Sequence, residues 1–565
     1  MLLAVRAHVI ALVFLAVTAA TSAAQETETV AGMSREEALR VGERMYRDGL
    51  LPSGEPMRAI VQGDIQVDGT MFSCQSCHLR SGVGSIEGTV LTLPTNAGWL
   101  YQPFQGARMS PTSRERMPSH LGREPARPPY TDETLARALR VGRDPTGRVL
   151  DPIMPRYLLR GAEMDLMVFY LKNLSAVPSP GVTETTLSFA TVVTEDVGAE
   201  DRDAFLKTLK AHIEAANSQS RQQERRSASG PWYKEEKYTA YRTLNLSIWE
   251  LKGAPETWKA QLEVYYREQP VFALLSGIST QDWRPIHEFC EENEIPDLLP
   301  ITDFPVVSDT DWYTLYFSKG WRQEGETVAK YLEGMENLPP ETRVVQVYRD
   351  DPEGRMLARG FRETREMLGQ PAAEDKVIGS GERCTESFWK ELARQTPECV
   401  LLIWLGSEDL TDLDSLAGSK NQPKIVFVSG NRLGADLYTL PPEVRSFTYA
   451  TYPYGLPGEK ERAELSTRQW LKARKIPVTN ERMQSQMYFV GWMLAGIIKK
   501  MRHDFYRDYF LDVVDMMRDQ YYSIATYRRL SFGPGQRYAS KGCYIVQLSE
   551  GPEPELVAKS GWVIH

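Results

Sequence analysis

The last two thirds of the chain alternates short apolar runs with amphipathic segments of helical length. Each run is long enough for one buried strand, and the segments between the runs repeat apolar residues about every 3.6 positions. The predicted strands are 187–193, 244–251, 271–275, 343–348, 399–405 and 424–428, with predicted helices at 201–217 and 258–268. Strands that alternate with helices predict parallel sheets covered on both faces. Because the pattern occurs twice, we expect residues 186–565 to form a two-lobed α/β domain.

The first third of the chain has helical periodicity at both ends. Ser34 precedes one amphipathic segment and Glu37 follows three residues later, as in a helix-capping box. The second segment, 161–174, places its apolar side chains on one face. We therefore expect residues 25–178 to form one helical unit. A proline-stiffened stretch follows, and we assign residues 179–185 as a linker.

The first residues have the pattern of an exported protein. Arg6 precedes the apolar run 9–17, and Ser22 and Ala24 suit the positions before a signal-peptidase cut. The run is shorter than the ~20 residues that a membrane-spanning helix requires. We predict a cleaved signal peptide over residues 1–24 and a location in the bacterial periplasm, with a retained membrane anchor as the alternative.

Composition limits the classes to which the chain can belong. Its 565 residues exceed one ordinary core, and 42% of them are hydrophobic, as in globular proteins. The formal net charge is −9, and the acidic excess lies after residue 178. Because the chain has no basic tract and no nucleic-acid-binding motif, we expect no nucleic acid as a partner.

The most informative motif is Cys74-Gln75-Ser76-Cys77-His78. Two thiols three positions apart and an adjoining imidazole are typical of a covalent haem c, with the histidine on the iron. A zinc site and a redox dithiol are the alternatives. The other cysteines are too far along the sequence to complete a zinc site, and glycines follow where a dithiol protein would continue a helix. The motif therefore predicts one haem c bound by Cys74, Cys77 and His78.

The helical unit resembles the class I cytochrome c family, whose first and last helices cross through a small-residue contact. Besides the haem motif, the resemblance rests on Gly42-x-x-x-Tyr46 and Leu166-x-x-x-Tyr170-Leu171. It implies an all-α cytochrome c domain with a methionine as second axial ligand. Met154 matches, because the proline after it favours a loop. The alternatives are Met109, Met117, His120 and an open site.

A stretch rich in proline and arginine, 91–129, looks like an insertion in this unit. We interpret its arginines as a solvated face rather than a docking surface, with contacts to the haem propionates as a further alternative. They are Arg108, Arg114, Arg116, Arg123 and Arg127.

Residues 186–565 resemble the type I periplasmic binding proteins, in particular ABC-transporter receptors for branched-chain amino acids and amides. The segments that carry the resemblance are 213–217 (IEAAN), 277–280 (GIST), 300–303 (PITD), 323–325 (QEG), 530–537 (LSFGPGQR) and 542–546 (GCYIV). Their order along the chain, on α/β periodicity, indicates the fold.

Ligands of open α/β sheets bind beyond the carboxyl ends of the strands. By position, the predicted ligand residues are Ser279, Thr280, Thr302, Asp303 and Ser318 in lobe one, and Tyr348, Asp351 and Asn431 in lobe two. The family grips an amino group with a lobe-two acid, whereas Asn431 stands near that place here. The resemblance therefore does not imply a free amino acid as ligand, and each hydroxyl has capping a turn as its alternative role.

The binding domain shows no hydrolytic constellation in its sequence. We expect His212, His287 and His503 on helices, without a nucleophile or acid in a triad-like context. Disulfide connectivity among Cys290, Cys384, Cys399 and Cys543 stays open. Pairing of Cys384 with Cys399 is disfavoured because the helix predicted between them is longer than a disulfide can bridge.

The sequence thus predicts a multidomain periplasmic protein, a monohaem cytochrome c joined to a solute-binding module. The leading hypothesis is a carrier of single electrons for a redox partner protein such as a periplasmic dehydrogenase, with the module docking a small molecule or a partner. One alternative is an ABC-transporter solute receptor or redox sensor that works with an ABC permease. The other is an enzyme that oxidises a small-molecule ligand held between the lobes.

Overall fold

The computed structural model describes residues 29–87, 90–104, 126–228, 242–339, 342–418, 420–518 and 520–564. The chain divides into two compact units, with the boundary between Pro178 and Ser179. The predicted signal peptide lies outside the described residues. Within those residues, no helix is long and apolar enough to cross a membrane.

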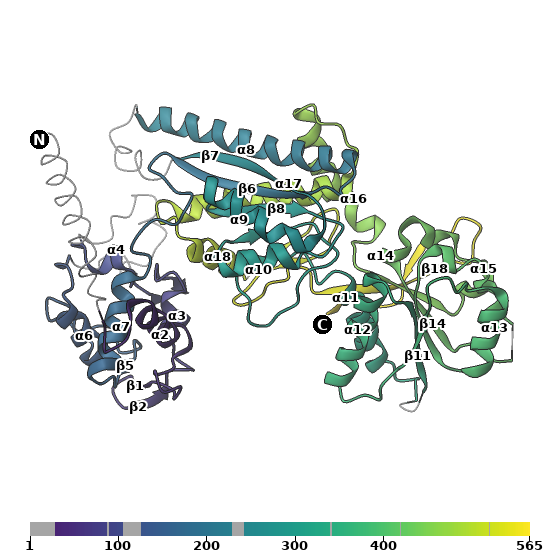
Figure 1. Ribbon diagram of the computed structural model, residues 1–565, viewed down its shortest axis with the longest axis horizontal. Helices are drawn as coiled ribbons and strands as arrows, with labels where there is room; N and C mark the ends of the chain where they lie inside the picture. The colour runs from purple at the N-terminus through teal and green to yellow at the C-terminus, as the bar shows by residue number, and fades with distance from the viewer. Residues whose placement is uncertain are drawn as a thin grey trace, which may run out of the picture. The chain divides into compact units, whose positions relative to one another are not determined.

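Unit 1 combines helices with a small antiparallel sheet (Figure 1). Its helices are α2 (Arg35–Asp48), α3 (Cys74–His78), α4 (Ala97–Leu100), α6 (Asp132–Val141) and α7 (Gly161–Asn173). Its strands are β1 (Arg58–Val61), β2 (Ile65–Asp68), β3 (Ile86–Glu87), β4 (Val90–Leu91) and β5 (Arg156–Tyr157). The prediction of an all-α unit is therefore wrong. Buried and exposed side chains alternate along β1, and this strand pairs with both β2 and β5.

The first and last helices of unit 1 cross where Gly42 meets Tyr170. A Cβ on Gly42 would lie 2.5 Å from the Cβ of Tyr170 and 3.0 Å from the carbonyl oxygen of Leu166. The rings of Tyr46 and Tyr170 lie 5.4 Å apart. Ser34 caps α2 by accepting a hydrogen bond of 3.2 Å from the amide of Glu37. The crossing predicted from these positions is confirmed, and glycine is required for it.

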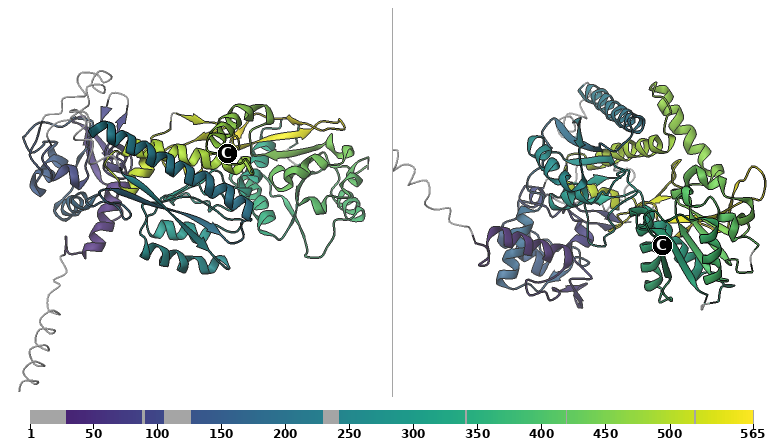
Figure 2. Two further views of the ribbon diagram at one scale, coloured as in Figure 1. Left: turned by 90° about the horizontal axis from the view of Figure 1, so that it is seen from above. Right: turned by 45° about the vertical axis from the view of Figure 1, so that its right-hand side comes forward.

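Unit 2 begins with a lobe built on a five-stranded parallel sheet in the order β10-β9-β8-β6-β7. The strands are β6 (Thr186–Thr194), β7 (Thr243–Leu251), β8 (Ala273–Ile278), β9 (Asp297–Leu298) and β10 (Thr314–Leu315). The helices are α8 (Ala199–Ala228), α9 (Trp258–Glu268), α10 (Arg284–Glu292), α17 (Glu481–Met501) and α18 (Arg507–Asp515), and the strands β16 (Tyr521–Tyr522) and β17 (Leu530–Ser531) form a separate hairpin. Phe189 and Val193 face α8 and α17, whereas Ala190 and Val192 face α9 and α10. Figure 2 shows α8 lying beside α17 along this sheet.

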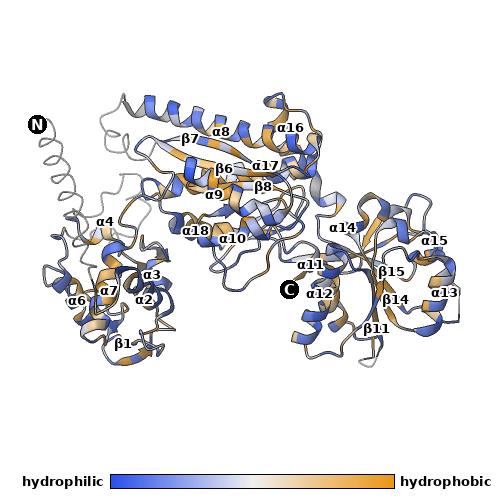
Figure 3. Ribbon diagram, viewed as in Figure 1, coloured by the Kyte–Doolittle hydropathy of each residue, from blue (hydrophilic) through white to orange (hydrophobic). Residues whose placement is uncertain are grey.

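The second lobe contains an eight-stranded sheet whose main path is β12-β11-β13-β14-β15-β18-β19. Its strands are β11 (Val344–Arg349), β12 (Glu374–Ile378), β13 (Val400–Trp404), β14 (Ile425–Ser429), β15 (Thr448–Tyr452), β18 (Gly542–Leu548), β19 (Leu556–Ala558) and β20 (Val563–Ile564). Its helices are α11 (Trp321–Glu333), α12 (Pro352–Met367), α13 (Glu386–Gln395), α14 (Gly430–Leu433) and α15 (Pro442–Arg445), and α16 (Pro457–Ala473) leads back to lobe one. The central strands β13 and β14 are apolar, and the helices carry polar outer faces, as Figure 3 shows. The predicted α/β fold with parallel sheets in two lobes is confirmed.

Three segments connect the lobes: one between β10 and α11, one between β15 and α17, and one between β17 and β18. The first and third pair with each other. The amide of Tyr316 donates to the carbonyl of Arg537 at 2.8 Å, and the amide of Ala539 donates to the carbonyl of Tyr316 at 3.0 Å. Paired connecting segments of this kind restrict relative motion of two lobes to a hinge.

Two predicted boundaries need correction. Strand β8 runs to Ile278 rather than ending at residue 275, because Ser276 and Gly277 are buried in the sheet, where the ring of Trp283 leaves no room for a Cβ on Gly277. The segment 179–185, assigned as a linker, packs on unit 2. Gly181, with φ +82°, approaches the backbone of Phe272 closely.

Candidate functional site

The haem motif forms the short helix α3, with Ser73 at its N-cap. Cys74 is buried and Cys77 is exposed, and neither is in a disulfide. Burial raises the pKa of the Cys74 thiol to about 11. Cys74 Sγ lies 3.8 Å from the hydroxyl of Tyr157, which donates to the carbonyl of Phe72 at 2.7 Å. On the other side of α3, the hydroxyl of Tyr46 donates to the carbonyl of Leu79 at 2.8 Å. The motif is therefore anchored at both ends.

The His78 imidazole is held by one ring nitrogen. Its Nδ1 lies 2.8 Å from the carbonyl oxygen of Leu93, so Nδ1 carries the proton and donates. Burial lowers the pKa of His78 to about 4, which keeps the ring neutral. A neutral imidazole that donates through Nδ1 presents the lone pair of Nε2, the arrangement in which histidine binds a metal.

Asn96 adds a second observation in this unit. Its side chain is fully buried, and both amide atoms lack a hydrogen-bond partner among the described residues. Its backbone amide donates to the carbonyl of Gly82 at 3.1 Å, which places it next to the segment that follows the motif. A buried amide without partners is costly unless another group satisfies it. The oriented His78 and the adjacent thiols fit a covalently bound haem.

Met154 lies in a turn that Arg156 holds in place. The Arg156 guanidinium donates to the carbonyl oxygens of Met154 at 2.6 Å, Leu150 at 2.9 Å and Asp151 at 3.1 Å. The Met154 side chain is partly buried against the core of unit 1. These contacts fit a fixed ligand loop, while the axial role of Met154 stays a prediction. The alternatives Met109, Met117 and His120 lie outside the described residues.

Arg127 does not belong to a solvated face. Its guanidinium donates to the carbonyl oxygens of Trp99 at 2.7 Å and Leu100 at 3.3 Å, and it lies 4.6 Å over the ring of Tyr130. The interpretation as a solvated arginine is therefore wrong for this residue, which instead ties its segment to α4. The other four arginines, Arg108, Arg114, Arg116 and Arg123, lie outside the described residues.

In unit 2, side chains from both lobes meet between the carboxyl edges of the two sheets. Asp303 comes from the loop after β9 in lobe one, and Asn431 from α14, directly after β14 in lobe two. Asn431 Nδ2 donates to Asp303 Oδ1 at 3.5 Å, and Asn431 Oδ1 accepts from the hydroxyl of Tyr454 and from Arg482 Nη1 at 3.4 Å. The Arg482 guanidinium lies 4.1 Å over the Tyr454 ring. We call Asp303, Glu324, Asn431, Tyr454 and Arg482 the interlobe cluster.

Glu324 is the buried acid of this cluster. It is fully buried on α11, and its Oε2 accepts from the hydroxyls of Ser429 at 2.8 Å and Thr451. Its Oε1 is buried without a partner among the described residues. Burial raises the pKa of Glu324 to about 7, although the two hydroxyls oppose this shift and the charge of Asp303 adds to it. The segment QEG helped to indicate the fold, but no local pattern indicates that Glu324 lies at the junction of the lobes.

Three of the predicted lobe-one hydroxyls serve turns. Ser279 Oγ accepts from the amide of Gln281 at 3.0 Å, Thr302 Oγ1 accepts from the amide of Phe304 at 3.0 Å, and Ser318 Oγ accepts from the amide of Gly320 at 3.2 Å. Thr280 differs, since its amide and its hydroxyl both donate to Asp196, a carboxylate that the sequence analysis did not single out. Asp303 is the predicted lobe-one residue that bonds to lobe two.

Among the predicted lobe-two residues, Asn431 joins the interlobe cluster and Tyr348 does not. Tyr348 is buried in the lobe core and its hydroxyl donates to Asp375 at 3.2 Å, because the alternation of β11 turns it toward α12. Its prediction as a ligand residue is corrected here. Asp351 caps α12 through the amide of Gly354 at 2.7 Å and pairs with Arg432 at 2.6 Å, next to Asn431.

The expectation for the histidines needs two corrections. His287 Nε2 lies 2.8 Å from Asp311 Oδ2, and its Nδ1 lies 2.9 Å from the hydroxyl of Tyr316. These partners are distant in the sequence, so no local pattern could reveal the Asp–His–Tyr chain. Tyr316 lies in a segment that connects the lobes. The hydrogen bonds from Asp311 through His287 to Tyr316 therefore anchor the hinge. His503 lies just after α17 rather than on a helix.

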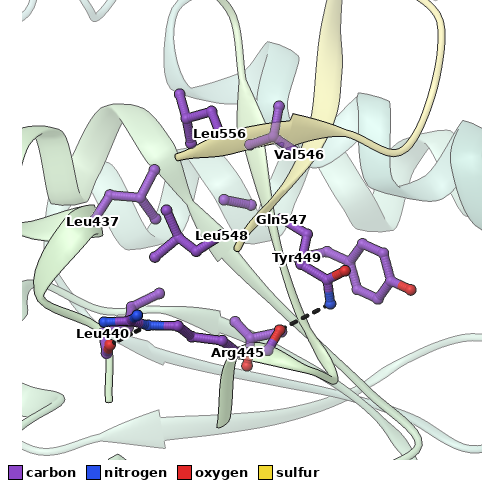
Figure 4. Close-up of a pocket in the computed structure, with 10 residues that line it drawn as sticks. Leu437, Leu440, Arg445, Tyr449, Val546, Gln547, Leu548 and Leu556 are labelled. Atoms are coloured by element: carbon purple, nitrogen blue, oxygen red, sulfur yellow. Dashed lines mark hydrogen bonds between the residues drawn. The ribbon is translucent and has the colours of Figure 1, made fainter. Parts of the chain in front are cut away.

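One pocket in lobe two is too small for a solute. It lies where β18 and β19 meet the segment 437–445, and Figure 4 shows Leu437, Leu548 and Leu556 around it. Its volume is about 10 Å³, enough for about one water molecule. Arg445 Nε donates to the carbonyl of Leu440 at 2.8 Å and seals one side.

No protein-family profile matches the chain, and no curated protein matches it. Solved structures that resemble it are substrate-binding proteins of ABC transporters. A fatty acid ABC transporter substrate-binding protein from Thermomonospora curvata is 15% identical, with a TM-score of 0.43, over 69% of this chain and 95% of that one. A solute-binding protein from R. palustris in complex with benzoate is 12% identical, with a TM-score of 0.43, over 67% and 96%. A branched-chain amino acid ABC transporter protein from Thermus thermophilus with bound valine is 11% identical, with a TM-score of 0.43, over 67% and 97%. Scores this low assign neither fold nor function to this chain, whose architecture is established by its own strand order.

Proposed function

We propose that the chain is a two-lobed solute receptor of the ABC-transporter type, located in the periplasm, that binds a small polar solute between its lobes. The observation that supports this best is the interlobe cluster. Asp303 of lobe one and Asn431 of lobe two meet beyond the carboxyl ends of their parallel strands, the place where open α/β sheets bind ligands. The partner that this proposal implies is an ABC permease.

The physical argument rests on the hinge. The contacts between Asp303, Asn431, Tyr454 and Arg482 include polar ones, and these side chains offer donors and acceptors with which a bound solute can pair. Motion about the hinge gives an open and a closed form of the two lobes. A solute that contacts both lobes stabilises the closed form by as much as its affinity for that form exceeds its affinity for the open form. Glu324, Arg482 and Tyr454 supply an acid, a cation and a hydroxyl around this position.

Native mass spectrometry of the purified protein tests the receptor proposal. We expect a non-covalent small-molecule adduct that dissociates on unfolding. Asp303→Ala should reduce its occupancy or affinity at least about tenfold, because the solute loses a hydrogen bond to a charged group. The matched control is Asp309→Ala, since Asp309 lies exposed in the same loop. Equal loss in both variants, or retention in both, contradicts binding at the interlobe cluster.

A second candidate function is one-electron transfer by unit 1, serving a redox partner protein. It is favoured by the fixed tautomer of His78 next to Cys74 and Cys77. A haem c bound there would supply exchange of single electrons between ferric and ferrous iron. Hydrogen bonds to Leu79, Phe72 and Leu93 hold the motif in one conformation. This candidate and the receptor are compatible in one chain.

Met154 provides the test of the axial ligand set. Met154→Ala should remove the weak far-red sulfur-to-iron absorption band and lower the reduction potential by a sizeable part of the ~0.8 V range that axial ligands span. The physical reason is that the soft thioether favours ferrous iron. Ile153→Ala, at the neighbouring exposed position, is the control and should keep both properties. If the native protein lacks the band, Met154 is not the second axial ligand of the iron.

A further inference from the structure

A separate cavity lies in lobe one, away from the interlobe cluster, between α8, α16, α17 and the start of β7. Its volume is about 170 Å³, and Ala215, Leu244, Trp470 and Tyr488 are among its lining residues. None of the lining residues is an Asp, Glu, Lys or Arg, and His212 is the one lining residue of a type that ordinarily takes up a proton near neutral pH. An apolar cavity of about 150 Å³ is known to hold a benzene molecule. The pocket here is partly open to solvent, and its volume is enough for one six-membered ring.

His212 is one of the polar residues that line the cavity, together with Gln219 and Tyr488. Its ring is stacked on Trp470 at 4.0 Å between centroids, with an interplanar angle of 13°, and Tyr488 lies 5.5 Å away. Gly491 on α17 permits this position, because a Cβ there would overlap the imidazole. His212 Nε2 is buried and has no hydrogen-bond partner among the described residues. The side chain is thus packed on Trp470 while one of its polar atoms is unsatisfied, and a small tilt of the imidazole would bring Nε2 to the pocket.

The surroundings keep the imidazole neutral. Burial lowers the pKa of His212 to about 3, and the positive charge of Arg474, which lies 4.0 Å over the Trp470 ring, adds to the effect. A neutral imidazole nitrogen is a donor in one tautomer and an acceptor in the other. A hydroxyl group can pair with either form, because it both donates and accepts.

We propose that this cavity is a second ligand site, which binds a small neutral aromatic molecule bearing one hydroxyl, a phenol. The ring occupies the aromatic and aliphatic lining, and the hydroxyl pairs with His212 Nε2. The site is lined by α8, α17 and β7 of lobe one together with Trp470 of α16, which belongs to a segment connecting the lobes, and it shares no residue with the interlobe cluster.

Calorimetric titration of the full-length, haem-loaded protein with phenol, and in parallel with toluene, tests the proposal. We expect one phenol per chain and at least about tenfold weaker binding of toluene, which has the shape but not the hydroxyl. His212→Phe keeps an aromatic ring on Trp470 and should weaken phenol about tenfold while leaving toluene unchanged. His503→Phe, at a half-exposed histidine beyond α17, is the matched control and should change neither affinity.

Ala215→Phe fills the cavity and should abolish binding of both molecules. If phenol does not saturate, or binds equally well to the His212→Phe and Ala215→Phe variants, the proposal is overturned and any binding belongs to another site. If His212→Phe does not fold, two other results test the proposal. The native chain should bind phenol more tightly than toluene, and Ala215→Phe should bind neither. Equal affinity for the two molecules would also overturn the role of His212.

Discussion

Replacing both Cys74 and Cys77 by serine is expected to remove covalent haem from the chain completely. In the proposed haem c site each thiol would form one thioether to the porphyrin, and serine cannot form that bond. The native protein should keep its haem through acid extraction and on a denaturing gel, whereas the double variant should lose it in both assays. The effect is all or none, because attachment depends on the chemistry of these two atoms and not on the stability of the fold.

The matched control for the cysteine variant is Ser76→Ala. Ser76 lies exposed between the two thiols on α3, and its hydroxyl donates to the carbonyl of Ser73 at 2.6 Å. The alanine variant perturbs the same helix without removing a thiol, so its haem should survive denaturation. Covalent haem in the Cys74→Ser, Cys77→Ser protein would show that attachment occurs elsewhere, and unit 1 would then need another explanation for its anchored histidine.

Replacing Glu324 by glutamine is expected to make unit 2 more stable above pH 7. Burial raises the folded-state pKa of Glu324 from 4.5 to about 7, so the folded chain holds this proton where the unfolded chain releases it. The contribution of Glu324 to the free energy of unfolding is therefore largest below pH 4.5, falls as pH rises to about 7, and is level above that. The loss amounts to about 3 kcal/mol, since one pKa unit corresponds to about 1.4 kcal/mol.

In Glu324→Gln this loss should be absent. The amide oxygen can still accept from Ser429 and Thr451, and the amide nitrogen takes the position of Oε1, which has no partner among the described residues. Thermal unfolding of unit 2, followed across pH, gives the difference between native and variant chains. Glu333→Gln, at the exposed end of the same helix, is the control. Its unfolding temperature should follow that of the native chain at every pH. Parallel pH profiles for the native and Glu324→Gln chains would refute the assignment.

The elements that the sequence predicts best are those whose packing follows their own periodicity. Strand β6 presents Phe189 and Val193 to one layer of helices and Ala190 and Val192 to the other, so apolar residues at both alternations mark it. Helix α9 begins at Trp258 and ends at Glu268, as predicted. Strand β1 escaped prediction because four residues of alternating burial are too short a signal.

The haem motif is local, so the sequence alone determines which thiols and which histidine lie together on α3. The sequence also determines the crossing of α2 and α7, since only glycine at position 42 permits it. The tertiary structure decided the rest of the candidate sites. Asp303 meets Asn431, His287 meets Asp311, and His212 meets Trp470 through contacts between elements far apart in the chain. Local periodicity reports which face of an element is buried, whereas the side chain that it meets depends on how the layers pack.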